Sequence, residues 1–372
     1  MRKSFSIYVL AALLMLLYGC GSKPESNLFR VEGHLSGFGN DPVTVYLYNA
    51  ALGDTPLDST SVSEDTFAFT YAVDTPAVAY VVAVTPAGPA RSFLVMEHGE
   101  VYLDMNNDSV AGTPLNESLC AFLRDFNEES YVASLRACLA DYYSASSIAE
   151  RKRVEAEYDS VETLRLSALS ASAMRCFEAN RNNVVGAFAL ARWASECRPQ
   201  WSEVEPLMAK AGKQVQSYAP LQQIVNGLRA AQNTAEGMHY VDVEGIDFAT
   251  GETTQLSNMI EGRLALVDFW ASWCAPCRSE ISENLIRIYE KYKGAGLQVV
   301  GIDVWDKPEA HRNAVSQLGI TYMQLIDTTR NATDLYGING IPEIILIAPD
   351  GTIKARGLRG NAIEQAVIDA LQ

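Results

Sequence analysis

A buried strand that leads directly into two closely spaced cysteines limits the possible folds of this chain. Residues 264–270 form a nearly continuous apolar run, which is typical of a strand covered on both faces of a sheet. The motif Trp273-Cys-Ala-Pro-Cys277 follows after two residues and opens a predicted helix. This part of the chain therefore places two thiols at a helix N-terminus beside a buried sheet.

Two cysteines separated by two residues at the start of a helix can form a disulfide. The unpaired backbone N–H groups and the dipole of the helix stabilise a thiolate at the first position, Cys274. Cys277 lies one turn further along, where it can attack a mixed disulfide formed by Cys274. We expect these two cysteines to carry the chemistry of the protein.

A metal site is one alternative, because a CxxC motif also forms half of a structural zinc site. The chain contains no second CxxC or CxxH motif that would complete four ligands. Its four histidines are widely scattered and show no HxxxH or HExxH spacing; they are His34, His98, His239 and His311. No metal site and no other cofactor is therefore expected.

Strands and helices alternate over residues 237–372. A second buried strand is predicted at 297–304, a helix follows it, and another strand is predicted at 322–326. Two shorter strands, at 343–348 and 352–356, flank a Pro-Asp-Gly turn and precede a C-terminal helix. A sheet that begins parallel and ends antiparallel indicates an α/β layer fold.

Residues 267–277 resemble the active-site strand and turn of the thioredoxin superfamily; they read Val-Asp-Phe-Trp-Ala-Ser-Trp-Cys-Ala-Pro-Cys. Gly340-Ile-Pro-Glu343 resembles the cis-proline loop of that family, and the hairpin follows where the fold has it. The extra strand and helix at 301–319 are similar to the membrane-anchored or periplasmic TlpA/ResA branch. The resemblance covers about residues 237–372 and implies a C-terminal α/β thioredoxin fold with a mixed sheet.

The resemblance assigns catalytic roles to four residues. Cys274 matches the exposed nucleophile and Cys277 the resolving thiol, and together they match the redox-active disulfide. Pro342 matches the cis-proline beside the disulfide, which leaves the backbone of Ile341 free to pair with an extended substrate. Asp268, six residues before Cys274, matches the buried acid that accepts a proton in thioredoxin.

Three residues around the cysteines are expected to contact the substrate. Trp273 matches the aromatic side chain that flanks the site, with packing in the core as the alternative. Ala275 and Pro276 lie between the two cysteines. Ser282 departs from the family, in which a proline usually kinks the active-site helix, so the bend of this helix is open.

The sequence around Asp268 also predicts its protonation behaviour. Its neighbours in the strand are all apolar, so a carboxylate there is largely desolvated. Desolvation disfavours the charged form and raises the pKa above the usual value of about 3.9. Such a carboxyl group can accept a proton from Cys277 near neutral pH. A hydrogen-bonded structural acid is the alternative.

The N-terminus predicts export from the cytoplasm. Arg2 and Lys3 precede the apolar run 7–18, which is too short for a permanent membrane span of ~20 residues but suits a signal peptide. Residues 17–20, Leu-Tyr-Gly-Cys, resemble a bacterial lipobox, although Tyr18 replaces the usual small residue. An ordinary secretory signal with an incidental cysteine is the alternative.

A lipobox implies that residues 1–19 are removed as a signal peptide and that Cys20 carries the lipid. Residues 20–27 then form a small, polar tether between lipid and domain. Several acyl chains anchor a protein firmly, so the chain is expected in the bacterial cell envelope, on the outer membrane and facing the periplasm. Thiols oxidise there unless something reduces them, so a membrane electron donor is an expected partner.

Two further regions precede the thioredoxin-like domain, which makes the chain multidomain. Residues 28–112 contain short strands with a period of two and predict a small antiparallel β-sandwich. Residues 113–236 are rich in Ala, Leu, Glu and Arg and predict helices. This front part resembles the β-rich, DUF4369-like and helical regions that precede such domains in lipoproteins of Bacteroidetes.

The helical region carries four more cysteines, namely Cys120, Cys138, Cys176 and Cys197. Small buried side chains in helix faces are the default expectation for them. One or two disulfides are the alternative, and the sequence does not rank the possible pairings.

The net charge argues against one class of partner. The chain has 29 Lys and Arg against 45 Asp and Glu, which gives a formal net charge of −16, and it has no basic cluster. Such a surface repels phosphate backbones, so nucleic acid is a poor partner. Protein thiols and disulfides are the expected substrates.

The leading hypothesis is a membrane-anchored thiol-disulfide oxidoreductase that reduces protein disulfides outside the cytoplasm. A peroxidase on the same fold needs a Pro-x-x-x-Thr-x-x-Cys setting, and the stretch Trp-Ala-Ser-Trp before Cys274 lacks the threonine. A copper chaperone needs a CxxxC motif and a nearby histidine, and only His311 follows His239. The non-enzyme alternative is a tethered binding or adaptor lipoprotein whose redox domain has little activity.

Overall fold

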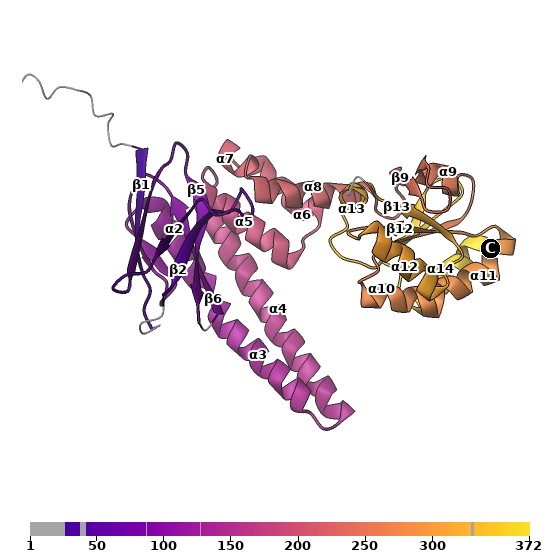
Figure 1. Ribbon diagram of the computed structural model, residues 1–372, viewed down its shortest axis with the longest axis horizontal. Coiled ribbons are helices and arrows are strands. Elements are labelled where there is room, and N and C mark those ends of the chain that lie inside the picture. The colour runs from indigo at the N-terminus through magenta and orange to yellow at the C-terminus, as the bar shows by residue number, and fades with distance from the viewer. Residues whose placement is uncertain (1–26, 38–41, 87, 127, 329–330) are drawn as a thin grey trace, which may run out of the picture. The chain divides into compact units, whose positions relative to one another are not determined.

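The computed structural model describes residues 27–37, 42–86, 88–126, 128–328 and 331–372 (Figure 1). The predicted signal peptide at 1–19, the predicted lipidation site Cys20 and the tether up to residue 26 lie outside these described residues. Among the residues described, no helix combines the length and the apolar character that a membrane span needs.

Contacts divide the chain into two compact units. The pieces of unit 1 are Met1–Cys197 and Ala211–Pro220, and those of unit 2 are Arg198–Lys210 and Leu221–Gln372. This division follows packing, whereas the limits predicted from the sequence follow the type of secondary structure. The predicted domain limits therefore stay predictions.

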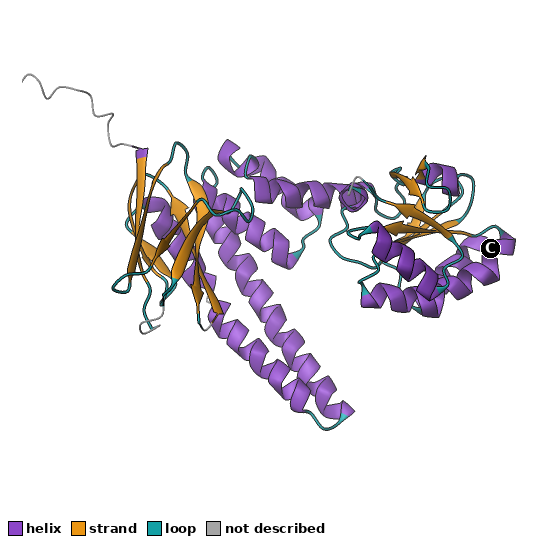
Figure 2. Ribbon diagram, viewed as in Figure 1, coloured by secondary structure: helices purple, strands orange, loops and turns teal. Residues whose placement is uncertain are grey.

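Unit 1 contains a β-sandwich (Figure 2). Within the described residues, the strand orders of its two sheets are β4-β1-β7-β8 and β3-β2-β5-β6. Neighbouring strands in them pair antiparallel, apart from the parallel pair β1–β7, so the predicted antiparallel sandwich is confirmed with that exception. The strands are β1 (Leu28–His34), β2 (Thr44–Asn49), β3 (Asp58–Ser61), β4 (Thr66–Ala72), β5 (Ala77–Thr85), β6 (Gly88–Met96), β7 (Gly99–Asp104) and β8 (Ser109–Ala111).

The sandwich forms because apolar and polar side chains alternate along its strands. In β1, Val31 is buried and Glu32 is exposed, and Val31 shares one apolar core with Val81 of the other sheet. Gly33 lies beneath the ring of Phe67, and a Cβ atom at this position would come within 2.0 Å of that ring. Any larger residue at 33 would therefore require the ring of Phe67, on the paired strand β4, to move.

Helices complete unit 1 (Figure 1). They are α2 (Pro114–Phe126), α3 (Glu128–Ser144), α4 (Ile148–Ala179), α5 (Val184–Cys197) and α7 (Lys213–Gln216). Asn116 on α2 fixes this helix to the edge strand β6. Its side chain accepts a hydrogen bond from the Val95 N–H at 2.8 Å and donates one to the Val95 carbonyl at 2.7 Å. It thereby satisfies backbone groups that an edge strand otherwise leaves unpaired.

The four cysteines of the helical region are free thiols in this structure. Cys120, Cys138 and Cys176 are buried, as the default expectation had it, and Cys197 is half-buried. Burial raises the pKa of the Cys176 thiol to about 11, which keeps it in the unreactive protonated form.

Unit 2 is built on a mixed sheet with the strand order β10-β9-β13-β12-β11-β14-β15 in the described residues. β11, β12 and β13 are parallel neighbours, and the other strands join antiparallel. The predicted C-terminal α/β fold with a mixed sheet is confirmed. The strands are β9 (Glu244–Asp247), β10 (Thr253–Gln255), β11 (Ala265–Trp270), β12 (Gln298–Asp303), β13 (Met323–Ile326), β14 (Glu343–Ile347) and β15 (Ile353–Ala355).

Two apolar clusters cover the two faces of this sheet, because successive side chains of a strand point to opposite faces. In β11, Leu266 and Trp270 belong to one cluster, and Val267 and Phe269 belong to the other. Residues of α10, α11, α12 and α14 complete the first cluster, and residues of α9 and α13 complete the second. The helices of unit 2 are α6 (Trp201–Lys210), α8 (Ala219–Asn233, of which the first two residues belong to unit 1), α9 (Leu256–Ile260), α10 (Ala275–Glu280), α11 (Ile286–Tyr292), α12 (Pro308–Leu318), α13 (Ala332–Tyr336) and α14 (Asn361–Leu371).

The helix that begins after Cys274 changes its geometry near Ser282, where the resemblance to thioredoxin-like proteins implies a proline. A π-helical turn, Ile281–Leu285, separates α10 from α11. Ser282 lies in this turn, and its hydroxyl group donates to the carbonyl oxygens of Arg278 at 2.9 Å and Ser279 at 3.2 Å. The π-turn interrupts the regular α-helix here without a proline. Turns of this kind are a recognised cause of helix bending.

Candidate active site

A disulfide joins Cys274 and Cys277 at the N-terminus of α10. Cys274 is the N-cap residue of this helix, and its Sγ accepts a hydrogen bond from the Cys277 N–H at 3.2 Å. Pro276 lies in the first turn, where a helix needs no backbone donor. The spacing of the two cysteines thus gives the predicted disulfide, while their separate catalytic roles stay predictions.

The two sulfur-bearing residues differ slightly in accessibility. Cys274 is 4% exposed and Cys277 is 0% exposed, and both belong to the same apolar cluster. The residue predicted to be an exposed nucleophile is therefore recessed. The accessibility of the two residues is nearly the same in the oxidised protein, so it does not assign the nucleophile.

Exposed side chains surround Cys274. Ala275 and Pro276 are exposed, and Trp273 is 61% exposed, so packing in the core is wrong for Trp273. Trp270 is fully buried instead, and its indole N–H donates to Oε1 of Gln324 at 3.0 Å. The three residues predicted to contact the substrate thus lie on the surface, where a polypeptide can reach them.

The loop after β12 holds the segment that precedes the cysteines. The carboxylate of Asp306 accepts a hydrogen bond from the Ser272 N–H at 2.6 Å. The indole N–H of Trp273 donates to the carbonyl oxygen of Trp305 at 3.2 Å. Trp305 has a φ of +56°, a left-handed conformation that bulky residues rarely adopt. Backbone strain of this kind is concentrated at functional sites.

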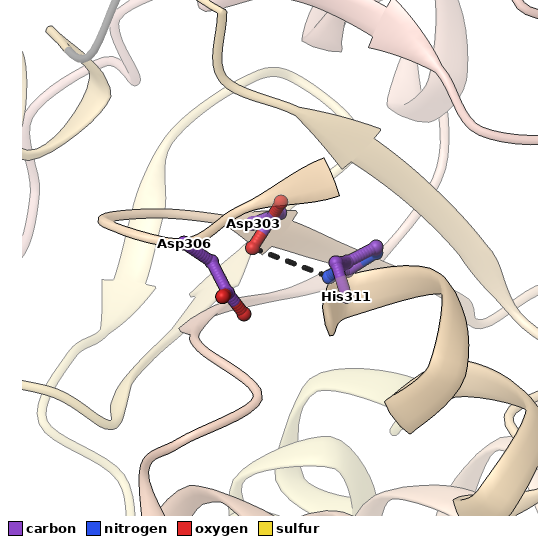
Figure 3. Close-up of side chains that lie close together, drawn as sticks. All are labelled: Asp303, Asp306 and His311. Atoms are coloured by element: carbon purple, nitrogen blue, oxygen red, sulfur yellow. Dashed lines mark ion pairs between the residues drawn. The ribbon is translucent and has the colours of Figure 1, made fainter. Parts of the chain in front are cut away.

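Asp303, at the end of β12, and His311, on α12, form a buried pair (Figure 3). Nδ1 of His311 lies 3.2 Å from Oδ1 of Asp303, and the imidazole ring packs against Trp270 and Phe248. Burial raises the pKa of the Asp303 carboxyl group, and His311 opposes this rise. The pair anchors both ends of the loop between β12 and α12.

One cluster in the described part of the chain has the geometry of a candidate cation site. It consists of Asp303, Asp306 and His311, whose possible ligand atoms all lie within 4.8 Å of one another. Both oxygens of Asp306 already accept backbone N–H bonds, from Ser272 and Lys307. We therefore interpret the group as a loop anchor. The sequence did not predict the pair of Asp303 and His311, because the contact joins a strand to a later helix.

Asp268 lies on the face of β11 that is turned toward the cysteines. It shares this face with Leu266 and Trp270, which belong to the cluster that contains the disulfide. Asp268 is fully buried, and neither of its carboxylate oxygens has a hydrogen-bond partner among the described residues. Burial raises the pKa of Asp268 to about 8, although Arg359 lowers it and Glu280 raises it further. The predicted rise in pKa is confirmed.

The cis-proline loop meets the same cluster. The Ile341–Pro342 peptide bond is cis, as the resemblance implies. Pro342 is buried, and the half-buried side chain of Ile341 packs against the apolar cluster that contains both cysteines. The carbonyl oxygen of Pro342 accepts a hydrogen bond from the guanidinium group of Arg359.

Three residues that influence Asp268 or lie near it in the fold were not predicted from the sequence. Arg359 lies on the loop after β15, Glu280 ends α10, and Tyr322 precedes β13. The Tyr322 hydroxyl group is buried without a hydrogen-bond partner in the described part of the chain. Burial raises the pKa of Tyr322 well above its usual value, and the charge on Asp268 raises it further. These residues lie on separate elements, so their contribution emerges only when the sheet and its loops are assembled.

Two parts of the chain match known families. Residues 239–356 match the AhpC/TSA family, and residues 29–119 match a domain of unknown function, DUF4369. The second match confirms the DUF4369-like resemblance of the front of the chain.

Curated relatives and a solved structure are similar to part of the chain. The chain is 26% identical over 124 residues to thiol-disulfide oxidoreductase ResA of Bacillus subtilis, which covers 33% of this chain and 68% of that protein. It is 34% identical over 101 residues to thiol:disulfide interchange protein HelX of Rhodobacter capsulatus, which covers 27% and 54%. The thioredoxin domain of a thiol-disulfide oxidoreductase from Bacteroides vulgatus is 29% identical, with a TM-score of 0.35, and the match covers 37% of this chain and 99% of that chain. The expected resemblance to ResA-type thiol-disulfide oxidoreductases is confirmed.

Proposed function

We propose that this protein is a lipid-anchored thiol-disulfide oxidoreductase of the cell envelope, which reduces protein disulfides through Cys274 and Cys277. The observation that carries the proposal is the disulfide at the N-terminus of α10, which lies in one apolar cluster with the strand face that bears Asp268. Asp268 is buried there, and its carboxylate oxygens have no hydrogen-bond partner among the described residues. The curated relatives are named for thiol-disulfide exchange, which supports the same chemistry here.

The first step is attack by Cys274 on the substrate. In the reduced protein, the N-terminus of α10 and the N–H of Cys277 stabilise a thiolate on Cys274. This thiolate forms a new S–S bond with one sulfur of the substrate disulfide. The original S–S bond of the substrate breaks, and its other sulfur leaves as a thiolate that takes a proton from water.

The second step is release of the mixed disulfide by Cys277. The proton of the Cys277 thiol passes to the carboxylate of Asp268, and the resulting thiolate attacks Sγ of Cys274. The Cys274–Cys277 disulfide forms, and the second substrate sulfur leaves as a thiolate. Two electrons have then passed from the dithiol to the substrate.

The substrate is bound next to Cys274 by the exposed side chains of Trp273, Ala275 and Pro276. The backbone of Ile341, before the cis-proline, pairs with an extended substrate segment. Because the partners are extended polypeptides that carry a disulfide, a partly unfolded protein is a better substrate than a folded one.

The cellular setting of the proposal comes from the N-terminus. Lipid on Cys20 anchors the protein to the outer membrane, facing the periplasm. The oxidised protein has to be reduced again after each turnover, which calls for an electron donor at the membrane. Cys20 lies outside the described residues, and the electron donor is a separate molecule, so each needs a test of its own.

Reduction of insulin by dithiothreitol tests the activity. The wild-type protein should accelerate precipitation of the insulin B chain over dithiothreitol alone, and Cys274→Ser should return the rate to that of dithiothreitol. Cys197→Ser is the matched control, because it removes a half-buried thiol outside the site and should keep the wild-type rate.

The same preparation separates the alternatives. An adaptor with a redox domain of little activity leaves the insulin rate unchanged, and a peroxidase consumes hydroperoxide faster than it reduces insulin. Either result would overturn the proposed function.

A further inference from the structure

We propose that Arg359 is a positioning residue for thiol-disulfide exchange, which holds the cis-proline loop and presents a positive charge to the buried Asp268. We also propose that Glu280 holds the loop that carries Arg359 and opposes its charge. The inference rests on the proposed function, because it assigns these residues to the second step of that reaction.

Arg359 contacts the cis-proline loop directly. Its guanidinium group donates to the carbonyl oxygen of Pro342, and a second nitrogen donates to the carbonyl oxygen of Leu358 at 2.7 Å. The backbone of the same loop is tied to the sheet, because the Leu358 N–H donates to the Ile344 carbonyl at 3.1 Å. Arg359 therefore fixes the residue that borders the predicted substrate-binding backbone of Ile341.

Glu280 links this loop to the active-site helix. Both of its carboxylate oxygens accept a hydrogen bond from the Gly360 N–H, each at 3.1 Å, and one accepts a bond from the Asn284 side chain at 2.8 Å. Glu280 ends the helix that Cys274 begins. A continuous set of contacts thus runs from the helix of the cysteines, through the loop at 358–360, to the cis-proline.

The charges around Asp268 come from these same two residues. The loop that carries Arg359 is bonded through Leu358 to Ile344, which pairs with Asp268 across the sheet. The charge of Arg359 lowers the pKa of Asp268, and the charge of Glu280 raises it. The strands on either side bring none, because Gly301 of β12 and Ile344 of β14 lie opposite Asp268. Tyr322 adds a buried hydroxyl group that is neutral at working pH, and the cysteines complete the surroundings.

The two charges act on the second step in opposite directions. Asp268 accepts a proton only as a carboxylate, and at pH 7 a group whose pKa is about 8 is mostly protonated. Arg359 favours the carboxylate and so increases the reactive fraction, whereas Glu280 decreases it. Because Arg359 is exposed, water and salt screen its charge, which keeps the effect moderate.

Stopped-flow reaction of the reduced full chain with dithiobis(nitrobenzoate) resolves the two steps. Attack by Cys274 releases one thionitrobenzoate, and attack by Cys277 on the mixed disulfide releases the second. Cys274→Ser measures the background from the other thiols. We expect Arg359→Gln to shift the pH profile of the second phase upward by up to about one unit and to slow it at pH 7 by up to about tenfold. The first phase should change less than about twofold, since Asp268 takes no part in it.

Three further variants make the test specific. Glu280→Gln, which keeps an oxygen that can accept the Gly360 bond, should shift the profile downward. Arg359→Lys keeps the charge and should restore most of the wild-type profile. Arg312→Gln removes an exposed arginine on α12 that contacts Phe248 and should leave the profile unchanged.

The outcomes separate the inference from the proposed function. A wild-type profile in Arg359→Gln, or a shift of both charge variants in the same direction, would overturn the positioning role. If the wild-type protein shows neither of the two phases, the proposed function itself is overturned.

Discussion

Asp268 and Gly301 lie opposite each other across the parallel strands β11 and β12. Gly301 brings no side chain, and a Cβ atom there would come within 2.4 Å of Oε1 of Gln324. Gln324 fills that space and accepts the indole N–H of Trp270 at 3.0 Å. Among the described residues, the carboxylate oxygens of Asp268 themselves have no hydrogen-bond partner.

Asp268→Asn should stabilise the oxidised protein at pH 7. In the unfolded chain this carboxyl group ionises near 3.8, whereas in the folded protein its pKa is about 8. Between these values the folded state binds more protons, so the free energy of unfolding falls as the pH rises through this window. An amide escapes that loss, which predicts a gain of roughly 2–4 kcal/mol at pH 7 and little gain at pH 4. Urea unfolding at both pH values measures it, and equal gains at the two would exclude ionisation as the cause.

The same variant should be slow in catalysis. As the proton acceptor for Cys277, Asp268 matters for release of the mixed disulfide and hardly for the attack by Cys274. We expect the second stopped-flow phase at pH 7 to fall by at least about tenfold in Asp268→Asn, with the first phase near the wild-type rate. An unchanged release rate would leave Asp268 a structural acid.

Asp306→Ala should loosen the segment before Cys274. The change removes the acceptor of the Ser272 N–H, and an unpaired backbone donor in this half-buried site costs about 1–2 kcal/mol of stability. Asp306→Asn keeps an acceptor oxygen and serves as the matched control. Equal loss of stability in both variants, measured by urea unfolding, would show that charge rather than the hydrogen bond matters here.

Features that depend on neighbours in the sequence could be predicted. Cys274 and Cys277 open a helix after a buried strand, and the apolar run around Asp268 was enough to predict its raised pKa. The period of two over residues 28–112 also predicted the strands of a sandwich in unit 1. The parallel pairing of β1 with β7 was not predicted, because it joins segments far apart in the sequence.

The supporting residues of the site were missed for the same physical reason. Arg359 and His311 contact residues on other elements, Pro342 and Asp303, and no local sequence pattern predicts such a contact. The short strands β9 and β10 were missed because three or four residues carry too little alternation to recognise.

Cys20→Ala tests the anchor. If residues 17–20 are a lipobox, this variant leaves the precursor uncleaved or unlipidated, since the thiol of Cys20 is the group that the lipid modifies. Metabolic labelling with a fatty-acid analogue followed by immunoprecipitation measures the modification. Label that persists on the Ala variant would remove the lipobox interpretation and favour an ordinary secretory signal.

The central claim is that Cys274 attacks the substrate and Cys277 releases it, and trapping of mixed disulfides in cells tests this most directly. Cys277→Ser can form the mixed disulfide but has no thiol to resolve it, so it should accumulate disulfide-linked complexes on non-reducing gels. Cys274→Ser should accumulate none, because Cys277 is fully buried. Equal trapping by both variants, or trapping by Cys274→Ser alone, would contradict the account.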